Sequence, residues 1–97
     1  MEEKELYERA LKKWGIEAQV SMAIEEMAEL TVELCHSLRQ NKFVAPTKVL
    51  EELADVQIMV EQLTLIFSSE IFDGQARKEE FEVYRRQKLQ KLKMYLD

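Results

Sequence analysis

The chain contains few of the residues that make turns and reactive sites. Its 97 residues include two glycines, one proline, one cysteine and one histidine. So little turn chemistry favours a few long helices over many short strands. The single cysteine, Cys35, cannot form an internal disulfide, so a reducing cytoplasm fits best. We expect Cys35 to be a small core residue rather than a nucleophile.

Long apolar runs are also missing. No stretch approaches the roughly 20 apolar residues that a membrane span requires. The first residues, Met1-Glu2-Glu3-Lys4, are acidic and lack the apolar core of a signal peptide. We therefore expect a cytoplasmic protein with no membrane partner.

Length and charge narrow the class of protein further. We expect residues 1–97 to form a single domain, and a domain of this size buries only a modest fraction of its surface. A hydrophobic share of 46% therefore favours an oligomer. Residues 1–74 carry 15 acidic and 7 basic side chains, whereas residues 75–97 carry 4 and 7. The acidic body argues against long nucleic acid as a partner, because neutralised phosphates supply most of that affinity.

Apolar residues at helical spacing predict four helical segments, residues 3–14, 16–39, 47–68 and 75–96. Gly15 separates the first two, residues 40–46 form a loop that contains the only proline, and Asp73-Gly74 forms a turn. The expected fold class is an all-α bundle of about four helices. Because the loop is short, the second and third segments should pack antiparallel. In the second segment, an aliphatic stripe that includes Ala23, Ile24, Leu30 and Leu38 lies on one side and the acidic residues lie on the other.

Carboxylates occur in two pairs with the same spacing. Glu26 and Glu29 belong to an E-E-x-x-E motif that begins at Glu25, and Glu52 and Asp55 form E-x-x-D. Helical residues three apart lie on neighbouring turns of one face. If the two segments are antiparallel, the pairs face one another and form an oxygen-rich site suited to Mg²⁺.

The third segment argues against acidic residues that are simply exposed to solvent. It is apolar most of the way round, and Glu52 and Asp55 lie between its two apolar faces. A carboxylate in such a place is strongly destabilised unless a cation or a proton compensates it. One small chain has too few helices to cover both apolar faces, which predicts a homodimer or a homotetramer.

The two motifs, with Trp14-Gly15 and Gln19 before them, resemble the MazG-like family of all-α nucleoside triphosphate pyrophosphohydrolases over about residues 6–67. The resemblance implies Mg²⁺-dependent hydrolysis of an NTP or dNTP to the monophosphate and pyrophosphate, in housecleaning or control of nucleotide pools. It implies a set of four Mg²⁺ ligands and two residues with catalytic roles. The ligands are Glu26, Glu29, Glu52 and Asp55, and the catalytic residues are Glu25 and Glu29.

The resemblance also suggests substrate contacts, each with a simpler alternative. Lys88 and Lys91, with Arg85 one turn earlier, are candidates for gripping the β- and γ-phosphates, although such residues are more often solvated. Gln19 can reach a base or simply be a polar helix position. For Trp14 we favour packing over stacking on a base. No Ser, Cys or His nucleophile is required, because in-line phosphoryl chemistry depends mainly on positioning and electrostatics.

Two other functions match parts of the sequence. A di-iron bundle needs two E-x-x-H motifs, and Glu33 to His36 supplies only one. A non-catalytic helical interaction module, an adaptor, remains an alternative. The placement of Glu52 and Asp55 among apolar residues separates the two readings, because an adaptor does not require it.

Overall fold

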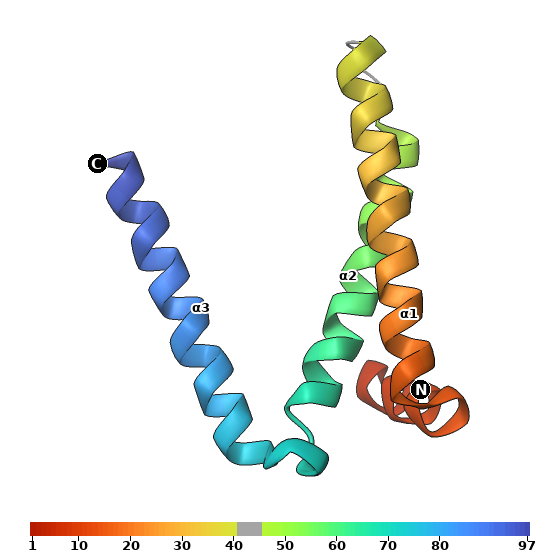
Figure 1. Ribbon diagram of the computed structural model, residues 1–97, viewed down its shortest axis with the longest axis vertical. Helices are drawn as coiled ribbons and strands as arrows, with labels where there is room; N and C mark the ends of the chain where they lie inside the picture. The colour runs from red at the N-terminus through yellow and green to blue at the C-terminus, as the bar shows by residue number, and fades with distance from the viewer. Residues whose placement is uncertain (41–45) are drawn as a thin grey trace. The chain divides into compact units, whose positions relative to one another are not determined.

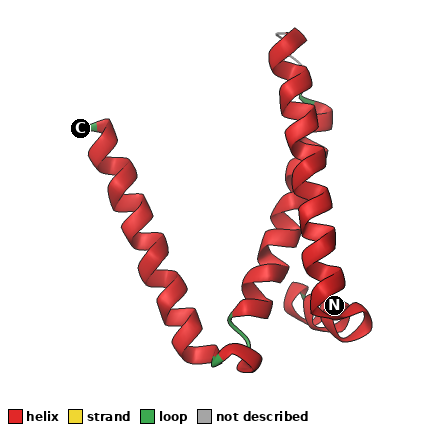
Figure 2. Cartoon of the chain, viewed as in Figure 1, coloured by secondary structure: helices red, strands yellow, loops and turns green. Residues whose placement is uncertain are grey.

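The computed structural model describes residues 1–40 and 46–97, and this part of the chain holds three α-helices, one 3-10 turn and no strand. The elements are α1 (Glu3–Gln40), α2 (Thr47–Phe67), η1 (Glu70–Phe72) and α3 (Gly74–Leu96) (Figure 1). The all-α prediction is confirmed, as the helical colouring of Figure 2 shows. Most of the predicted loop at residues 40–46 lies outside the described residues. Within the described ranges, no helix has the length and apolar character needed to cross a membrane.

Helix α1 is broken at Gly15, as the sequence predicted. Gly15 has φ 85° and ψ 169°, whereas the residues around it are helical. That backbone region is essentially restricted to glycine. Residues 3–14 therefore form a short helical stretch that turns away from the axis of residues 16–40 (Figure 1).

The chain divides into two compact units, Met1–Leu65 and Ile66–Asp97, which we describe one at a time. In the first unit, residues 16–40 of α1 lie beside α2 and run in the opposite direction (Figure 1). This is the antiparallel arrangement that the short connection predicted.

The seam between α1 and α2 follows a three- and four-residue spacing. Its least exposed positions are Gln19, Ala23, Glu26, Leu30 and Glu33 on α1 and Val49, Glu52, Val56, Met59 and Leu63 on α2. Such spacing keeps one face of each helix against its partner. The seam is unusually polar, because Gln19 and Glu52 are only 5% and 6% exposed.

Part of the aliphatic stripe of α1 lies outside the seam. Ile24 and Leu38 are 60% and 70% exposed, whereas Glu26 lies in the seam. Ala23 and Leu30 of the stripe do lie in the seam, but Ile24 is one residue beyond Ala23, and one residue turns a helix by about 100°. Ile24 and Leu38 consequently lie to one side of the seam. Cys35 is also exposed rather than part of the core.

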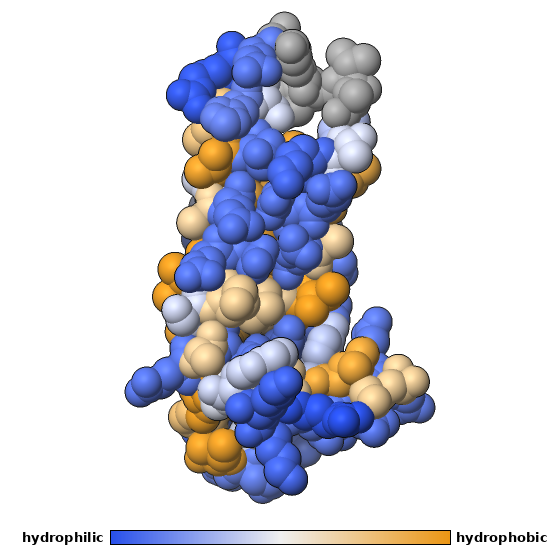
Figure 3. Space-filling model, turned by 90° about the vertical axis from the view of Figure 1, so that its right-hand side faces the viewer, coloured by the Kyte–Doolittle hydropathy of each residue, from blue (hydrophilic) through white to orange (hydrophobic). Residues whose placement is uncertain are grey.

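Helix α2 likewise leaves apolar side chains outside the seam, with Leu53 and Val60 each 45% exposed. One face of the molecule shows a hydrophilic band over the helices, with hydrophobic side chains at its margins (Figure 3). Apolar surface of this kind is expected where another surface packs.

The second unit begins with a tight turn. The rings of Phe67 and Phe72 pack with centroids 5.2 Å apart. Asp73 then adopts the left-handed conformation with φ 62°, and α3 starts at Gly74. A Cβ at Gly74 would lie 2.9 Å from Glu70 Oε1, so a side chain there would require the Glu70 carboxylate to move. The predicted Asp73-Gly74 turn is confirmed.

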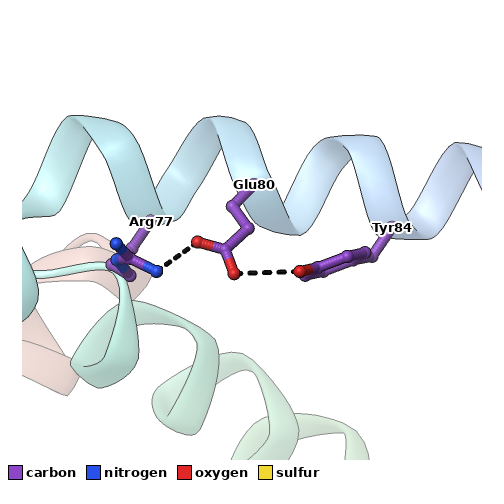
Figure 4. Close-up of polar contacts among 3 residues, drawn as sticks. All are labelled: Arg77, Glu80 and Tyr84. Atoms are coloured by element: carbon purple, nitrogen blue, oxygen red, sulfur yellow. Dashed lines mark hydrogen bonds and ion pairs between the residues drawn. The ribbon is translucent and has the colours of Figure 1, made fainter.

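Polar side chains on α3 form hydrogen bonds with one another along the helix. Arg77 donates to Glu80, and the Tyr84 hydroxyl donates to the other oxygen of Glu80 at 3.1 Å (Figure 4). The Glu80 hydrogen bond is the largest cause of a raised pKa at Tyr84. Leu89 and Leu92 on this helix are 49% and 54% exposed.

Candidate metal centre

Three carboxylates from the two antiparallel helices meet in the seam. Glu26 of α1 and Glu52 and Asp55 of α2 each place an oxygen within 4.8 Å of the other two. Oxygens on opposite sides of one Mg²⁺ or Ca²⁺ ion are about 4.0–5.2 Å apart. One oxygen from each side chain can therefore reach a single divalent cation.

Two of these carboxylates have an oxygen without a partner. Glu26 Oε2 and Glu52 Oε2 are buried, and neither has a hydrogen-bond partner among the described residues. Buried polar atoms are normally hydrogen-bonded, and an unpaired anionic oxygen is more unfavourable than a neutral one. A cation would supply the missing partner to both oxygens. A donor set made only of carboxylates suits hard ions such as Mg²⁺, Ca²⁺ or Mn²⁺.

The pKa of Glu26 also indicates a site that favours a cation. Burial raises its pKa, and the charges of Glu29, Asp55, Glu52 and Glu25 raise it further, in that order. Both effects disfavour the charged form of the carboxyl. The cluster is therefore short of positive charge when all of its members are ionised.

In the described part of the chain, Lys48 forms an ion pair with this cluster, and no prediction from the sequence included it. Its Nζ lies 3.4 Å from Glu52 Oε1 and 3.8 Å from Glu51 Oε2. The hydrogen bond to Glu52 raises the pKa of Lys48, and the charges of Glu52 and Glu51 add to the effect. The four-residue spacing to Glu52 was a signal that could have found this lysine.

The structure brings together three of the four predicted metal ligands. Glu29 is exposed and lies outside the group of three, although its charge is the second largest influence on the pKa of Glu26. Glu25 is also exposed and has the smallest effect in that series. Neither of these two residues contributes an oxygen to the cluster in this conformation.

The predicted phosphate-binding residues lie on α3. Arg85, Lys88 and Lys91 are all exposed and belong to the second unit. Lys91 Nζ lies 5.9 Å from the centre of the Tyr95 ring. Their structural surroundings are those of a solvated helix.

A cavity of about 1020 Å³ lies farther along the same seam. Gln19 and Met59 line it, and they precede Glu26 and follow Glu52 by seven residues. Seven helical residues span about 10 Å, or two turns. Cavity and carboxylate cluster are thus neighbours along the α1–α2 pair, with Gln19 as the predicted site residue that faces the cavity.

Trp14 lines the cavity, and the expectation that it packs between helices was wrong. Trp14 is 59% exposed and lines the cavity, with Lys13 Nζ 5.3 Å from its ring centre. Tyr7 lines the cavity too, and its hydroxyl donates to Glu61 at 2.6 Å. No sequence signal pointed to that pair, because its members are 54 residues apart and joined only by the fold.

Comparison with known proteins adds no relative. No family model matches the chain, and no curated protein or solved structure matches it either.

Proposed function

We propose that the protein hydrolyses a nucleoside triphosphate to the monophosphate and pyrophosphate with the help of Mg²⁺. The observation that carries the proposal is a buried oxygen on each of Glu26 and Glu52 that has no hydrogen-bond partner among residues 1–40 and 46–97. With Asp55, these residues would hold the ion. When bound, Mg²⁺ neutralises charge on phosphate oxygens and lowers the pKa of a bound water.

The substrate class rests on two further observations. The E-E-x-x-E and E-x-x-D motifs resemble those of MazG-like pyrophosphohydrolases, which supplies the nucleotide and the bond that is cleaved. The cavity lies about 10 Å from the carboxylates along the helices. That spacing suits a ligand with a ring at one end and phosphates at the other. Gln19 would then contact the base.

Residues around the cluster have supporting roles in this proposal. Glu29, already close enough to raise the pKa of Glu26, would join as a fourth ligand after a change of side-chain rotamer. Glu25 would orient the attacking water. For the β- and γ-phosphates, the resemblance alone implies Arg85, Lys88 and Lys91. The biological role would be housecleaning or control of nucleotide pools.

The proposal includes self-association. The apolar side chains outside the seam, such as Ile24, Leu38, Leu53 and Val60, would pack against a second copy and complete a bundle of about four helices. A helix pair that leaves this much apolar surface in water gains stability when the surface is covered. We propose a homodimer or a homotetramer.

Binding of the ion can be tested apart from catalysis. A ligand that binds only the folded state stabilises it by RT ln(1 + [L]/Kd). Mg²⁺ should therefore raise the melting temperature, whereas NaCl at the same ionic strength should not. Glu26→Gln should abolish the shift, and the matched variant Glu17→Gln, at an exposed position on α1, should keep it. If no divalent cation stabilises the wild type, the metal centre is wrong and the adaptor function becomes the better explanation.

Catalysis is tested with a panel of canonical and modified NTPs and dNTPs in the presence of Mg²⁺. The expected products are the monophosphate and pyrophosphate. Release of orthophosphate from the same substrates would place the cleavage at a different bond and contradict the assignment.

A further inference from the structure

Residues 3–14 form one wall of the cavity. Leu6, Tyr7, Ala10 and Trp14 from this stretch face residues from beyond Gly15 and from α2 across the cavity. The stretch joins the rest of α1 at the break in helical geometry. Access to the cavity therefore depends on where this short helical stretch lies.

Gly15 has the properties of a hinge. Its φ of 85° is open to glycine and strained for other residues, and a Cβ added there would meet nothing within 4 Å. The glycine is thus required by the backbone conformation and not by close packing.

A polar contact holds residues 3–14 against α2. The Tyr7 hydroxyl donates to Glu61 Oε2 at 2.6 Å, a short distance typical of a hydroxyl bonded to a carboxylate. The pKa of Tyr7 is raised to about 12, with this hydrogen bond as the largest cause and burial and the charges of Glu61 and Glu3 adding to it. Such a bond is modest in net strength, since water can replace either partner. The bond can hold residues 3–14 against α2 and still break reversibly.

The cavity lining fits a flat ring with polar edges. Trp14 and Tyr7 offer aromatic faces, and Met22 and Met59 offer polarisable thioethers. Gln19 and Gln62 bring amides, and each amide has both donors and an acceptor. Nitrogen heterocycles carry that combination of faces and edges.

We propose that residues 3–14 form a hinged wall that closes over a planar nitrogen heterocycle, with Gly15 as the hinge and the Tyr7–Glu61 hydrogen bond as the latch. The identity of the ring as a nucleotide base rests on the proposed function. When the Tyr7–Glu61 hydrogen bond breaks, residues 3–14 are free to move. Loss of this bond therefore speeds the exchange of the bound ring.

Trp14 reports on the cavity directly, because it is the only tryptophan of the chain and lines the cavity. The four ribonucleoside monophosphates AMP, CMP, GMP and UMP are titrated in EDTA, which removes any contribution from a metal or from hydrolysis. At least one should change Trp14 fluorescence. Stopped-flow dilution of the complex then gives the dissociation rate constant.

Glu61→Ala is the main variant, because Glu61 is exposed and does not line the cavity. Loss of the latch should raise the dissociation rate constant by about threefold to tenfold, as expected for one hydrogen bond. Tyr7→Phe should do the same, and the double variant should add nothing. Tyr84→Phe is the matched control, since it removes a similar Tyr–Glu bond on α3. It should leave the rate constant unchanged.

Gly15→Ala tests the hinge. A side chain at φ 85° is strained, so residues 3–14 should shift and Trp14 should become more accessible to acrylamide. The ring-binding part is wrong if none of the four monophosphates changes Trp14 fluorescence. The latch is wrong if Glu61→Ala and Tyr7→Phe leave the dissociation rate constant unchanged. Stabilisation by Mg²⁺ and triphosphate hydrolysis would survive either result, which separates this failure from failure of the proposed function.

Discussion

Lys48 and Glu52 form an ion pair that uses only one side of the carboxylate. Lys48 Nζ lies 3.4 Å from Glu52 Oε1, while Glu52 Oε2 is buried and has no hydrogen-bond partner in the described part of the chain. The lysine side chain is 60% exposed, whereas that of the glutamate is 8% exposed. Lys48 therefore neutralises the carboxylate from the solvent side and leaves the inner oxygen to the cluster with Glu26 and Asp55.

Removing Lys48 should strengthen metal binding. In Lys48→Met, a positive charge near the carboxylates disappears, and repulsion of the incoming cation disappears with it. At an exposed site this effect is worth about 1 kcal/mol, or roughly fivefold in affinity. The measurement is the Mg²⁺ concentration that gives half of the maximal shift in melting temperature. Lys4→Met, which breaks an exposed pair with the same spacing to Glu8, is the control. Weaker binding in Lys48→Met would instead mean that the lysine holds Glu52 in its binding position.

Glu52→Gln should separate activity from stability. The substitution keeps the size of the side chain and removes one charge that would support the ion, so hydrolysis should fall by at least about 100-fold. The metal-free protein should be as stable as the wild type or more stable, because like charges in the cluster repel one another. Initial rates with Mg²⁺ and urea unfolding in EDTA test the two effects. Glu51→Gln, a neighbour that also faces Lys48, should change neither value much. Near-normal hydrolysis by Glu52→Gln would contradict the metal site.

Apolar periodicity was enough to predict the helices, and the glycine was enough to predict the break at Gly15. The apolar spacing predicted the segments, and only glycine readily adopts the backbone conformation observed there. The meeting of Glu26 with Glu52 and Asp55 also followed from the antiparallel arrangement. These features depend on local preferences and on the length of one connection.

The orientation of α1 about its own axis could not be predicted in this way. Hydrophobicity favoured burial of Ile24 and Leu38, yet the seam contains Gln19 and Glu26. The choice depends on how two helices fit together and on which surfaces remain for a partner, and neither is encoded in the spacing of one helix. Tyr7 and Glu61 were missed for a similar reason, because only the fold brings them together.

The exposed apolar side chains predict how the oligomer can be broken. Leu53→Glu places a charge on the outer face of α2, where it would have to be desolvated at an interface between copies. Sedimentation at micromolar concentration should show an oligomer for the wild type and a monomer for Leu53→Glu. Leu53→Met keeps the position apolar with little change in volume, so it should remain an oligomer. A monomeric wild type with full activity would show that self-association is not needed.

The raised pKa of Glu26 predicts how the stability of the metal-free protein depends on pH. Below its usual value of 4.5, the carboxyl is protonated in both the folded and the unfolded state, so it causes no loss of stability. Above 4.5, the unfolded chain releases the proton first, because burial and neighbouring charges raise the pKa in the folded state. The folded state then binds more protons, and stability falls as pH rises until the folded pKa is passed.

Urea unfolding in EDTA between pH 4 and pH 7 should therefore show a loss of stability in the wild type that Glu26→Gln lacks, since the amide does not titrate. Glu17→Gln, exposed on the same helix, should follow the wild type. Saturating Mg²⁺ should reverse the trend, because an ion held by carboxylates competes with their protons and binds better as pH rises. Parallel pH curves for the wild type and Glu26→Gln would show that Glu26 titrates alike in both states. The carboxylate cluster would then exert no net strain on the folded protein, and the need for a cation at this position would disappear with it.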